Sequence, residues 1–599
     1  MKVKVAKYIA DFWAENGIEH VFTVTGGGAM HLNDAFGHHS KLTCIYNHHE
    51  QASAIAAEGY TRLSGKIAGV CVTSGPGGTN AITGVLGGWL DSIPMFIISG
   101  QVKRETTTWS TDIPLRQLGD QEFNIVSAVK GMTKYAHMIV EANEIRYHLE
   151  KALYLSKNGR GGPVWLDIPL DIQAAFVDTD KLVGFDASEL EKKENPIYDE
   201  RITKEILQKI IGAKRPVILA GTGIRLSGAY RAFLEMIDKL QIPVVTAWNA
   251  HDLLWESHPL YCGRPGTVGT RGGNFVVQNS DLVFVLGCRL NIRQISYNYK
   301  NWAPNAYKII VDIDKHELQK PTITPDLPIW ANASDVMNSI VGSSYEADNL
   351  EHKTWLQWSK QINEKYPAVL EKYYKFNTPL NPYVFISKLS KNLDEGEKII
   401  CGNGSACVIT FQGIEIKKEQ RLFTNSGCAA MGYGFPAAIG ACISDGNKRT
   451  ICIDGDGSFQ MNIQELQTVV YNQLNIKIIY LNNNGYHSIR QTQTNLFQPP
   501  LVGVCEGNGL SFPEARKIAY AYGIPYRCID SIECIEKVIK DVLTTKGPVF
   551  CEVIVDTAQN FEPKLSSKVM PDGKIVSPAI DDMYPFIDNE EYDRNKKMV

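Results

Sequence analysis

Two short polar segments in the last third of the chain could together hold a metal-bound diphosphate. The apolar run RTICID leads into residues 455–458 (GDGS), and the run IKIIYL leads into residues 482–486 (NNNGY). Glycines allow backbone N–H groups to approach phosphate oxygens closely. Asp456 and Asn483 offer the carboxylate and amide oxygens that Mg²⁺ accepts, and the Gly485 carbonyl could add a third ligand.

The elements around these two segments predict that they lie side by side. Between them runs NIQELQTVVYNQL, whose apolar residues fall on roughly one face of a helix. The unit is therefore strand, helix, strand, and the carboxyl ends of parallel strands are where open α/β sheets bind ligands. Either segment alone would be typical of an ordinary turn or loop. Both together, at two strand ends, predict a magnesium diphosphate site.

The same segments carry a family resemblance. GDGSF followed by LNNNGY resembles the cofactor signature of thiamine diphosphate enzymes, in the branch that includes acetolactate synthase and pyruvate decarboxylase, and the resemblance covers nearly the whole chain. It implies that Asp456, Asn483 and the Gly485 carbonyl bind Mg²⁺. The further cofactor contacts that we expect in this domain are Gly455, Gly457, Ser458, Tyr486 and, after the run KIIC, Gly404 and Ser405.

Glu50 is the candidate activating carboxylate in the first domain. It lies between the apolar run LTCIYNHH and the helical pattern EQASAIAAEGYTRLSG, a segment very similar to that of the family. The resemblance implies that Glu50 hydrogen-bonds the pyrimidine N1′ and so promotes loss of the thiazolium C2 proton, after which the cofactor carries the carbon chemistry. The alternative is a glutamate that only complements the helix dipole in a first turn.

Two more loops resemble cofactor contacts of the family. SGPGGTN is similar to the loop that packs on the pyrimidine ring, which implies contacts from Pro76 and Asn80. SGCAAMGYGFPAAIGA is similar to the loop beneath the bent cofactor, which places Met431 under the two rings; a core methionine is the alternative. Because the family binds the two ends of one cofactor to different subunits, the resemblance implies a homodimer or homotetramer.

Departures from the acetolactate synthase pattern bear on the substrate. Asp120 stands where those enzymes carry Phe, before Gln121 and Glu122, and Thr492 stands where they carry Trp. An acidic side chain would repel a second 2-oxo acid. NNNGYHSIRQTQ and the tail PDGKIVSPAIDDMYPFI are more similar to acetolactate synthase-like proteins of polysaccharide and deoxysugar pathways.

We therefore expect a carboligase that decarboxylates a 2-oxo acid, with pyruvate as donor, and transfers the two-carbon unit to a carbonyl acceptor, either a nucleotide-linked keto-sugar or a second 2-oxo acid. The alternative is a lyase or hydrolase, either a 2-oxo acid decarboxylase or a diketone hydrolase. An inactive regulatory subunit is disfavoured because Glu50, Asp456 and Asn483 are all present.

Side chains that we expect near the substrate come from two regions. Besides Glu50, the candidates are Asp120, Gln121, His487 and Arg490, and plain surface polarity is the alternative for the last two. The polar tail, residues 556–599, is expected to fold over the site as a lid that excludes water, with a disordered tail as the alternative.

The central region contains a third resemblance. GCRLNIR is similar to the stretch by which acetolactate synthases hold FAD, and it maps that role onto Arg289 and Arg293, with Asn291 in place of an Asp. Several relatives keep this domain without the flavin. FAD therefore joins thiamine diphosphate and Mg²⁺ as an expected cofactor whose presence stays open.

The whole chain predicts an α/β fold with three doubly wound parallel-sheet domains. Apolar runs alternate with amphipathic stretches in residues 1–180 (pyrimidine-binding), 195–340 (central) and 376–555 (diphosphate-binding), with a polar linker at 181–200. VCVTSGPGGTNAITGV and ICIDGDGSFQMNIQEL share one plan, so the first and third domains are expected to be related folds. TWLQWSKQINEKY is expected to form a helix between the second and third domains.

Composition excludes several classes of protein. A formal net charge of -4 without a long Lys/Arg run argues against a nucleic-acid partner. No apolar stretch is long enough for a membrane span or a signal peptide, so we expect a cytoplasmic protein that acts on small molecules. The 13 cysteines include no Cys-x-x-Cys pair, which favours buried free thiols.

Overall fold

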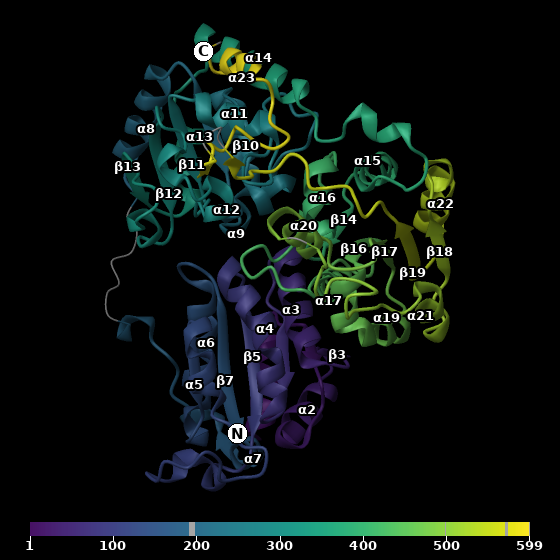
Figure 1. The fold of residues 1–599 in the computed structure, drawn as a ribbon. Helices are drawn as coiled ribbons and strands as arrows, with labels where there is room; N and C mark the ends of the chain where they lie inside the picture. The colour runs from purple at the N-terminus through teal and green to yellow at the C-terminus, as the bar shows by residue number, and fades with distance from the viewer. Residues whose placement is uncertain (191–197, 498, 570–572, 598–599) are drawn as a thin grey trace.

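The computed structural model describes residues 1–190, 198–497, 499–569 and 573–597. Its three large β-sheets are parallel and are flanked by helices, and a C-terminal tail crosses from the third domain to the central one (Figure 1). The expected three-domain α/β architecture is therefore confirmed. Part of the predicted linker, residues 191–197, lies outside the described residues.

The first domain contains a six-stranded sheet with the order β3-β2-β4-β5-β7-β6. Its strands are β2 (His20–Thr23), β3 (Thr43–Tyr46), β4 (Gly69–Val72), β5 (Met95–Gln101), β6 (Tyr135–Met138) and β7 (Pro163–Pro169). The main helices are α1 (Val5–Glu15), α2 (Met30–Gly37), α3 (Glu50–Ser64), α4 (Pro76–Asp91) and α6 (Ile145–Lys157). Every residue of β4, β5 and β7 is buried, which explains why these strands read as continuous apolar runs.

The third domain repeats this topology. Its order is β15-β14-β16-β17-β19-β18, so counting strands along the chain gives the same sequence, 2-1-3-4-6-5, in both domains. The strands are β14 (Lys398–Cys401), β15 (Arg421–Phe423), β16 (Thr450–Gly455), β17 (Ile476–Asn482), β18 (Tyr526–Ile529) and β19 (Val549–Ile554). The helices include α15 (Pro382–Asn392), α16 (Ser405–Gly413), α17 (Gly434–Ser444), α18 (Asp456–Phe459), α19 (Leu466–Tyr471), α20 (His487–Leu496), α21 (Ala515–Ala521) and α22 (Ile532–Thr544). The shared order agrees with the sequence similarity between the two domains.

The central domain has a five-stranded sheet with the order β10-β9-β11-β12-β13. Its strands are β9 (Pro216–Ala220), β10 (Val244–Thr246), β11 (Leu282–Leu286), β12 (Tyr307–Asp312) and β13 (Leu327–Trp330). The helices are α8 (Glu200–Gly212), α9 (Gly223–Leu226), α10 (Tyr230–Leu240), α11 (Arg271–Asn279), α12 (Ile292–Ile295) and α13 (Ala333–Gly342). The helix expected in TWLQWSKQINEKY is α14 (Leu350–Lys365).

The helix expected between the two diphosphate segments is interrupted. α18 runs into a 3₁₀ segment, Gln460–Glu465, and α19 begins only at Leu466. Asn462 has a non-helical conformation (φ -136°, ψ 30°) and its amide donates to the Gly432 carbonyl (2.7 Å) and to Gln51 Oε1 (3.0 Å). The Asn462 side chain thus joins this segment to a neighbouring loop and to the first domain.

The first and third domains pack directly against each other through α3 and α17. A Cβ atom at Gly59 would overlap the backbone of Ala437, and one at Gly440 would overlap the backbone of Ala56. Small side chains therefore allow the two helices to approach closely, and no larger residue fits at either glycine. The helix that begins at Glu50 is therefore packed directly against α17 of the third domain (Figure 1).

The tail beyond β19 crosses the molecule before it ends. It passes α15 and α16 and reaches the central domain, where α23 (Asn589–Lys597) lies beside α14 (Figure 1). Arg271 of α11 donates to the carbonyls of Met583 (3.2 Å) and Pro585 (2.6 Å), and Tyr366 donates to Glu591 (2.6 Å). Within the described residues, no helix is both long and apolar enough to cross a membrane.

Candidate active site

The predicted magnesium ligands come together at the carboxyl ends of β16 and β17. The two strands pair in parallel with Gly455 opposite Leu481, so the segments that follow them are neighbours. The Asp456 carboxylate is buried and accepts the backbone N–H groups of Asn483 (3.1 Å) and Gly485 (3.0 Å). Burial raises the pKa of Asp456 to about 6 despite these hydrogen bonds. A bound cation would favour the ionised carboxylate.

Asn483 has an oxygen that the protein leaves without a partner. Its amide nitrogen donates to Ser405 Oγ (3.2 Å), whereas its buried Oδ1 has no hydrogen bond among the described residues. Buried polar atoms are rarely left unsatisfied, so this oxygen fits a ligand role. No cluster of three or more His, Cys, Asp or Glu side chains that could hold a metal occurs in the described parts of the chain. A cation here would therefore need amide, carbonyl and phosphate oxygens beside Asp456.

The two glycines that flank Asp456 differ in what surrounds them. A Cβ at Gly457 would overlap the Tyr486 ring, which itself packs against Phe512. A Cβ at Gly455 would meet no protein atom within 4 Å. The backbone at Gly455 is therefore open, as a phosphate-binding loop requires, while Gly457 and Tyr486 form its packed side. Ser458 Oγ accepts the N–H of Gly432 (2.9 Å).

Glu50 begins α3 and lies against the start of α4. The side chain of His49 caps the helix by accepting the N–H of Gln51 (3.0 Å). Asn80 donates to Glu50 Oε2 (2.9 Å), and a Cβ at Gly77 would lie 3.7 Å from Oε1. Pro76 occupies the first position of α4. The structure thus brings Glu50, Pro76 and Asn80 together, as expected for the pyrimidine end of the site.

The segment with Asp120 and Gln121 reaches the same place. Gly75 adopts φ +56° just before Pro76, and a Cβ there would lie 2.6 Å from the Gln121 carbonyl oxygen. Asp120 and Gln121 are exposed in the single chain. Glu122 instead points inward, where it accepts from the Thr108 N–H (3.0 Å) and hydroxyl (2.8 Å) and so stabilises the loop.

Within one chain the two halves of the site remain separate. Among the described residues, no hydrogen bond connects the Glu50 carboxylate with the Asp456 cluster, although Gln51 does bond to Asn462. Buried Glu465 adds another link between the domains, because it accepts from the Asn47 amide (2.9 Å) and the His48 N–H (3.0 Å).

Met431 lies on a loop, residues 424–433, that we call the bend loop. Both of its ends are bound to the first domain: the Gly427 N–H donates to Asp91 (3.0 Å), and the Tyr433 hydroxyl donates to Glu58 (2.6 Å). A single buried arginine, Arg62, forms ion pairs with both of these carboxylates. We call this group, Glu58, Arg62 and Asp91, the buried ion cluster.

A cavity of about 370 Å³, which we call the inner cavity, lies beside the bend loop. Gly404 and Ala429 line one part of it, and Gly404 has φ +65° at the start of α16. Thr492, expected near the substrate, also lines this cavity. Cations come from Arg293 of the central domain and Lys564 of the tail. The tail thus contributes directly to the cavity wall.

His487 and Arg490 do not line the inner cavity. The imidazole of His487 is buried against the tail, where Nε2 hydrogen-bonds the Gln559 carbonyl (2.8 Å), and burial lowers its pKa to about 4. Arg490 donates to the carbonyls of Asn483 (3.0 Å) and Asn484 (2.6 Å). His487 therefore anchors the tail, and Arg490 supports the predicted metal-binding loop from outside.

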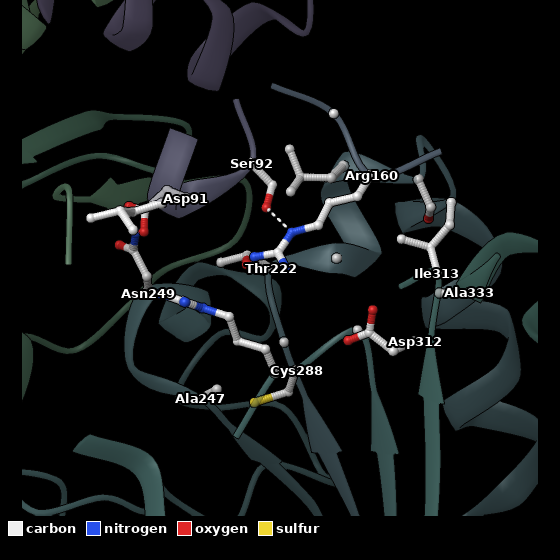
Figure 2. Close-up of a pocket in the computed structure, with 18 of the residues that line it drawn as sticks. Asp91, Ser92, Arg160, Thr222, Ala247, Asn249, Cys288, Asp312, Ile313 and Ala333 are labelled. Carbon is white, nitrogen blue, oxygen red and sulfur yellow. Dashed lines mark hydrogen bonds between the residues drawn. The ribbon is translucent and has the colours of Figure 1, made fainter. Parts of the chain in front are cut away.

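The two arginines assigned to a flavin line different cavities. Arg289 lines a cavity of about 460 Å³ between the first and central domains, which we call the interdomain cavity, whereas Arg293 lines the inner cavity. Figure 2 shows Cys288, Asp312 and Thr222 around the interdomain cavity. Thr222 and Cys288 come from turns that follow β9 and β11, and Asp312 is the last residue of β12. Burial raises the pKa of Asp312 to about 6.

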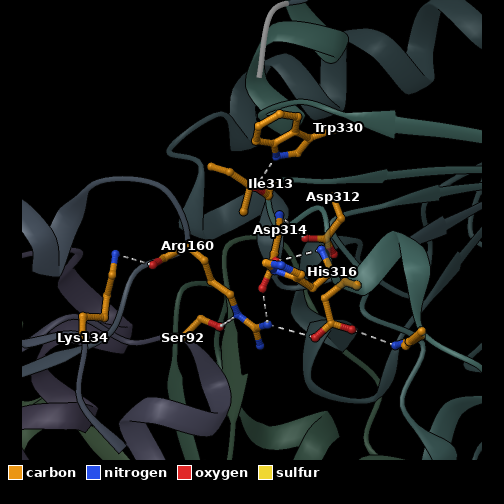
Figure 3. A network of polar contacts seen from close by, with 10 residues as sticks. Ser92, Lys134, Arg160, Asp312, Ile313, Asp314, His316 and Trp330 are labelled. Carbon is orange, nitrogen blue, oxygen red and sulfur yellow. Dashed lines mark hydrogen bonds and ion pairs between the residues drawn. The ribbon is translucent and has the colours of Figure 1, made fainter. Parts of the chain in front are cut away.

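Arg160 of the first domain connects the interdomain cavity to the central domain. Its guanidinium donates to Ser92 (2.8 Å) and forms ion pairs with Asp314 (3.2 Å) and Glu317 (2.9 Å), as Figure 3 shows. Its carbonyl accepts from Lys134 (2.7 Å). The edge of the cavity is therefore fixed by contacts from both domains.

Comparison with known proteins agrees with this geometry. Three family models match the chain: the N-terminal thiamine pyrophosphate-binding domain over residues 3–128, the central domain of thiamine pyrophosphate enzymes over 203–340, and the C-terminal thiamine pyrophosphate-binding domain over 402–553. The chain is 29% identical to the acetolactate synthase isozyme 1 large subunit of Escherichia coli K12 (93% of this chain, 95% of the relative). It is 30% identical to the probable acetolactate synthase large subunit of Methanococcus aeolicus (94% and 93%) and 31% identical to the acetolactate synthase large subunit of Lactococcus lactis (94% and 94%).

Fold and site together define a thiamine diphosphate-dependent enzyme, with one cofactor-binding half in the first domain and the other in the third. The chain belongs to the thiamine pyrophosphate enzyme family and is an acetolactate synthase-like member of it. The resemblance stated from the GDGSF and LNNNGY segments is confirmed at the level of the family.

Several residues of the site escaped the sequence analysis. The buried ion cluster, Glu465, Arg160 and Lys564 all act across domain boundaries, and each lies in a segment that looks like an ordinary helix or loop. In a single sequence the only available signal was a charged residue within an apolar or small-residue helix, as in AIAAEGYTR.

Proposed function

We propose that the protein is a carboligase that takes a two-carbon unit from pyruvate and joins it to the carbonyl carbon of an acceptor, with a nucleotide-linked keto-sugar as the favoured acceptor. One observation carries this proposal: the same chain contains both halves of a cofactor site. Beside Asp456, the Asn483 Oδ1 has no hydrogen-bond partner among the described residues, and in the first domain the Glu50 carboxylate is held by Asn80. The relatives named acetolactate synthase support pyruvate as the donor.

The overall reaction breaks one carbon–carbon bond and forms another. In pyruvate the bond between the carboxyl and carbonyl carbons breaks and CO₂ leaves; the former carbonyl carbon forms a bond to the acceptor carbonyl carbon, and the acceptor oxygen takes up a proton. The bound thiamine diphosphate supplies the nucleophilic carbon and the electron sink for this exchange. Glu50 would hold a proton at the pyrimidine nitrogen, Asp456 and Asn483 would hold the metal, and the bend loop would support the cofactor rings.

A product analysis tests the proposal. Purified holoenzyme incubated with pyruvate and a panel of keto-sugar nucleotides and small ketones should give products heavier by C₂H₄O, detected by mass spectrometry, together with CO₂. Pyruvate alone should give little acetaldehyde. Fast acetaldehyde release that added acceptors leave unchanged would instead support the alternative, a simple 2-oxo acid decarboxylase.

We propose that two copies of the chain complete each site. The support is the separation of the Glu50 and Asp456 clusters within one chain, together with exposed apolar side chains near both. In the first domain these are Trp109, Ile113, Leu115, Leu118 and Phe123; in the third they are Ile489, Leu496, Phe497 and Val502. A subunit-mixing experiment at limiting Mg²⁺ tests this: E50Q and D456N, each of low activity alone under this condition, should regain activity when co-expressed, because one mixed site then has both intact halves. No recovery in a verified mixed dimer would contradict the arrangement.

Mg²⁺ is the metal that we propose for the Asp456 and Asn483 oxygens, because the donors are all hard oxygens. D456N removes a full charge from the ligand set and should weaken Mg²⁺ activation by at least about tenfold. A Mg²⁺ titration of activity and of cofactor binding measures this, and an unchanged Mg²⁺ dependence would rule Asp456 out as a ligand.

We further propose that the interdomain cavity binds FAD. It lies at the carboxyl ends of β9, β11 and β12, the usual edge for a dinucleotide, and Asp312 and Arg289 could hold ribose hydroxyls and phosphate. Gly221 and Gly287 pack so closely that a Cβ on Gly221 would overlap the Gly287 carbonyl, which keeps the turn compact. Purified protein should show flavin absorbance near 450 nm, lost in D312A; colourless protein that takes up no added FAD would refute this assignment.

A further inference from the structure

Two cationic side chains line the inner cavity, and neither forms an ion pair with another described residue. Arg293 comes from α12 and Lys564 from the tail, and both lie in the cavity wall that includes Gly404 of the third domain. Among the described residues, no carboxylate lies within ion-pair distance of either group. Lys564 is half-buried, and Arg293 is exposed in the single chain at the mouth of the cavity. A cavity with two unpaired cations attracts an anion.

The backbone of Thr267 joins the two chain segments that carry these cations. The Thr267 N–H donates to the Arg293 carbonyl (2.8 Å), and the Thr267 carbonyl accepts the N–H of Leu565 (2.7 Å), next to Lys564. Thr267 thus connects the chain at Arg293 with the chain at Lys564. The two side chains therefore project from backbone that is fixed in relative position before any ligand binds.

The tail segment at Lys564 is bound on its other side as well. Buried Gln412 donates to the Pro563 carbonyl (2.6 Å), and the Glu562 N–H donates to the Tyr383 hydroxyl (2.9 Å). Segments fixed by buried hydrogen bonds lose little conformational entropy when a ligand arrives. Lys564 is therefore a pre-organised part of the wall rather than a mobile surface lysine.

The surroundings of the two cations do not neutralise them. Burial lowers the pKa of Lys564, and Glu562 opposes that effect from a distance while its own carboxylate accepts the Tyr373 hydroxyl (3.2 Å). Arg293 lies over the Trp248 ring at 5.7 Å, a contact that attracts the guanidinium without neutralising it. A bound anion would stabilise the charged form of the partly desolvated Lys564 ammonium, because it supplies the counter-charge that the protein does not.

We propose that Arg293 and Lys564 form an anion clamp that selects an acceptor with a phosphate or diphosphate group, while the acceptor carbonyl faces the bend loop. The inference rests on the carboligase function proposed above and names the class of its acceptor. A carboxylate carries one charge, whereas a phosphate monoester carries about -1.5 to -2 at neutral pH and three acceptor oxygens. The second charge and the third oxygen suit a site with two cations.

Matched acceptors test the clamp. With holoenzyme and pyruvate, dihydroxyacetone phosphate should have a kcat/KM at least about 100-fold above that of dihydroxyacetone, from two charge-assisted contacts. K564M and R293M should each lower kcat/KM for the phosphorylated ketone roughly 10- to 100-fold and leave the neutral ketone within about twofold. Lys568 of the same tail, paired with Asp582 at 3.4 Å, gives the control variant K568M, which should change neither. Equal rates for the two ketones, or equal losses for both in K564M, would overturn the clamp.

Two competitors distinguish the sources of the phosphate. UDP that inhibits at far lower concentration than inorganic phosphate indicates a nucleotide-linked acceptor, and equal inhibition by both indicates a simple sugar phosphate. K564M should raise the inhibition constant of either anion by the same factor by which it lowers kcat/KM for the phosphorylated ketone. A lack of inhibition by both anions contradicts the proposal.

Two further measurements distinguish a failure of the clamp from a failure of the carboligase function and from a role of Lys564 in cofactor binding. Release of CO₂ from carboxyl-labelled pyruvate reports the donor reaction alone: no release with any acceptor defeats the carboligase function itself, whereas release without preference for a charged acceptor defeats only the clamp. Thiamine diphosphate affinity of K564M should equal that of the unchanged protein. A tenfold weaker affinity would assign Lys564 to the diphosphate of the cofactor and overturn its role in acceptor binding.

Discussion

At the scale of single residues, Glu50 carries the sharpest prediction. Its carboxylate is held by Asn80 at 2.9 Å beside Gly77, where it can share a proton with a ring nitrogen. E50Q keeps the size and the hydrogen bond but cannot take part in proton transfer, so kcat should fall by about 10²- to 10⁴-fold. Steady-state kinetics measure this loss, and calorimetry should show that thiamine diphosphate still binds. The exposed glutamate Glu105 gives the control E105Q, which should retain activity; substantial turnover by E50Q would contradict its role.

The two glycines beside Asp456 allow a second prediction at this scale. G457A places a methyl group against the Tyr486 ring, so it should lower both the stability of the apoprotein and its cofactor affinity. G455A meets no protein atom, so it should leave the apoprotein stable and weaken only the cofactor. Thermal unfolding with and without thiamine diphosphate and Mg²⁺ compares them. If G455A and G457A change the stability of the apoprotein and the cofactor affinity to the same extent, no ligand passes over Gly455.

At the scale of elements, Asp167 of β7 anchors the loop that carries Gln121. It accepts from Ser99 (2.6 Å) and from Gln101 (3.0 Å), and Gln101 also donates to the Phe123 carbonyl (2.9 Å). Burial raises the pKa of Asp167 to about 7, so the folded protein keeps a proton that the unfolded chain releases near pH 4. The contribution of Asp167 to the free energy of unfolding is therefore fully present below about pH 4 and is lost as the pH rises through 7.

The variant D167N removes that titration and keeps the shape of the side chain. The urea midpoint of the unchanged protein, relative to D167N, should decline between pH 5 and pH 8 because only the aspartate must ionise in a buried site. A difference that stays constant over this range, with the same m-value, would show that Asp167 is already ionised at pH 5.

The elements that the sequence predicted, and those that it did not, differ in where they lie. The apolar runs HVFTV, MFIISG, PVWLDIP, PVILAG, DLVFVLG, KIIVD and PVFCEVIV, with those named above, predict all the central strands of the three large sheets, because parallel strands covered on both faces must be apolar. The strands of these three sheets that no such run predicts are β6, β13, β15 and β18, and all four lie at sheet edges. Edge strands such as YAHM and YRCI are only partly buried, so their sequences carry little of that signal.

The same physical reason separates the predictable part of the site from the rest. Asp456 and Asn483 follow strands directly, and Glu50 begins the helix shortly after β3, so strand ends place them, and their chemistry is local to a few residues. Arg293 and Lys564 line one cavity only because the tail crosses to the central domain, which brings together residues 271 positions apart in the chain. The separation of Arg289 from Arg293 into two cavities likewise depends on how α12 is placed against the third domain.

At the scale of the whole molecule, the buried ion cluster joins the first domain to the bend loop. Arg62 neutralises Glu58 and Asp91, which in turn hold Tyr433 and Gly427. R62M leaves two carboxylates buried without a counter-charge, so it should cost about 3–5 kcal/mol of stability. Hydrogen exchange of residues 424–433 in the holoenzyme should accelerate, and kcat should fall while the affinity for Mg²⁺ is kept.

Two matched variants decide whether that effect comes from charge. R104M removes a half-exposed arginine of the first domain that pairs with Glu141, and it should change stability by less than about 1 kcal/mol. The triple variant E58Q/R62M/D91N removes all three charges and retains the oxygen atoms that accept from Tyr433 and Gly427. It should regain much of the lost stability, because an uncharged buried group has no unpaired charge to desolvate. If the triple variant is as unstable as R62M, the arginine contributes through packing, and the bend loop is held by something other than its charge.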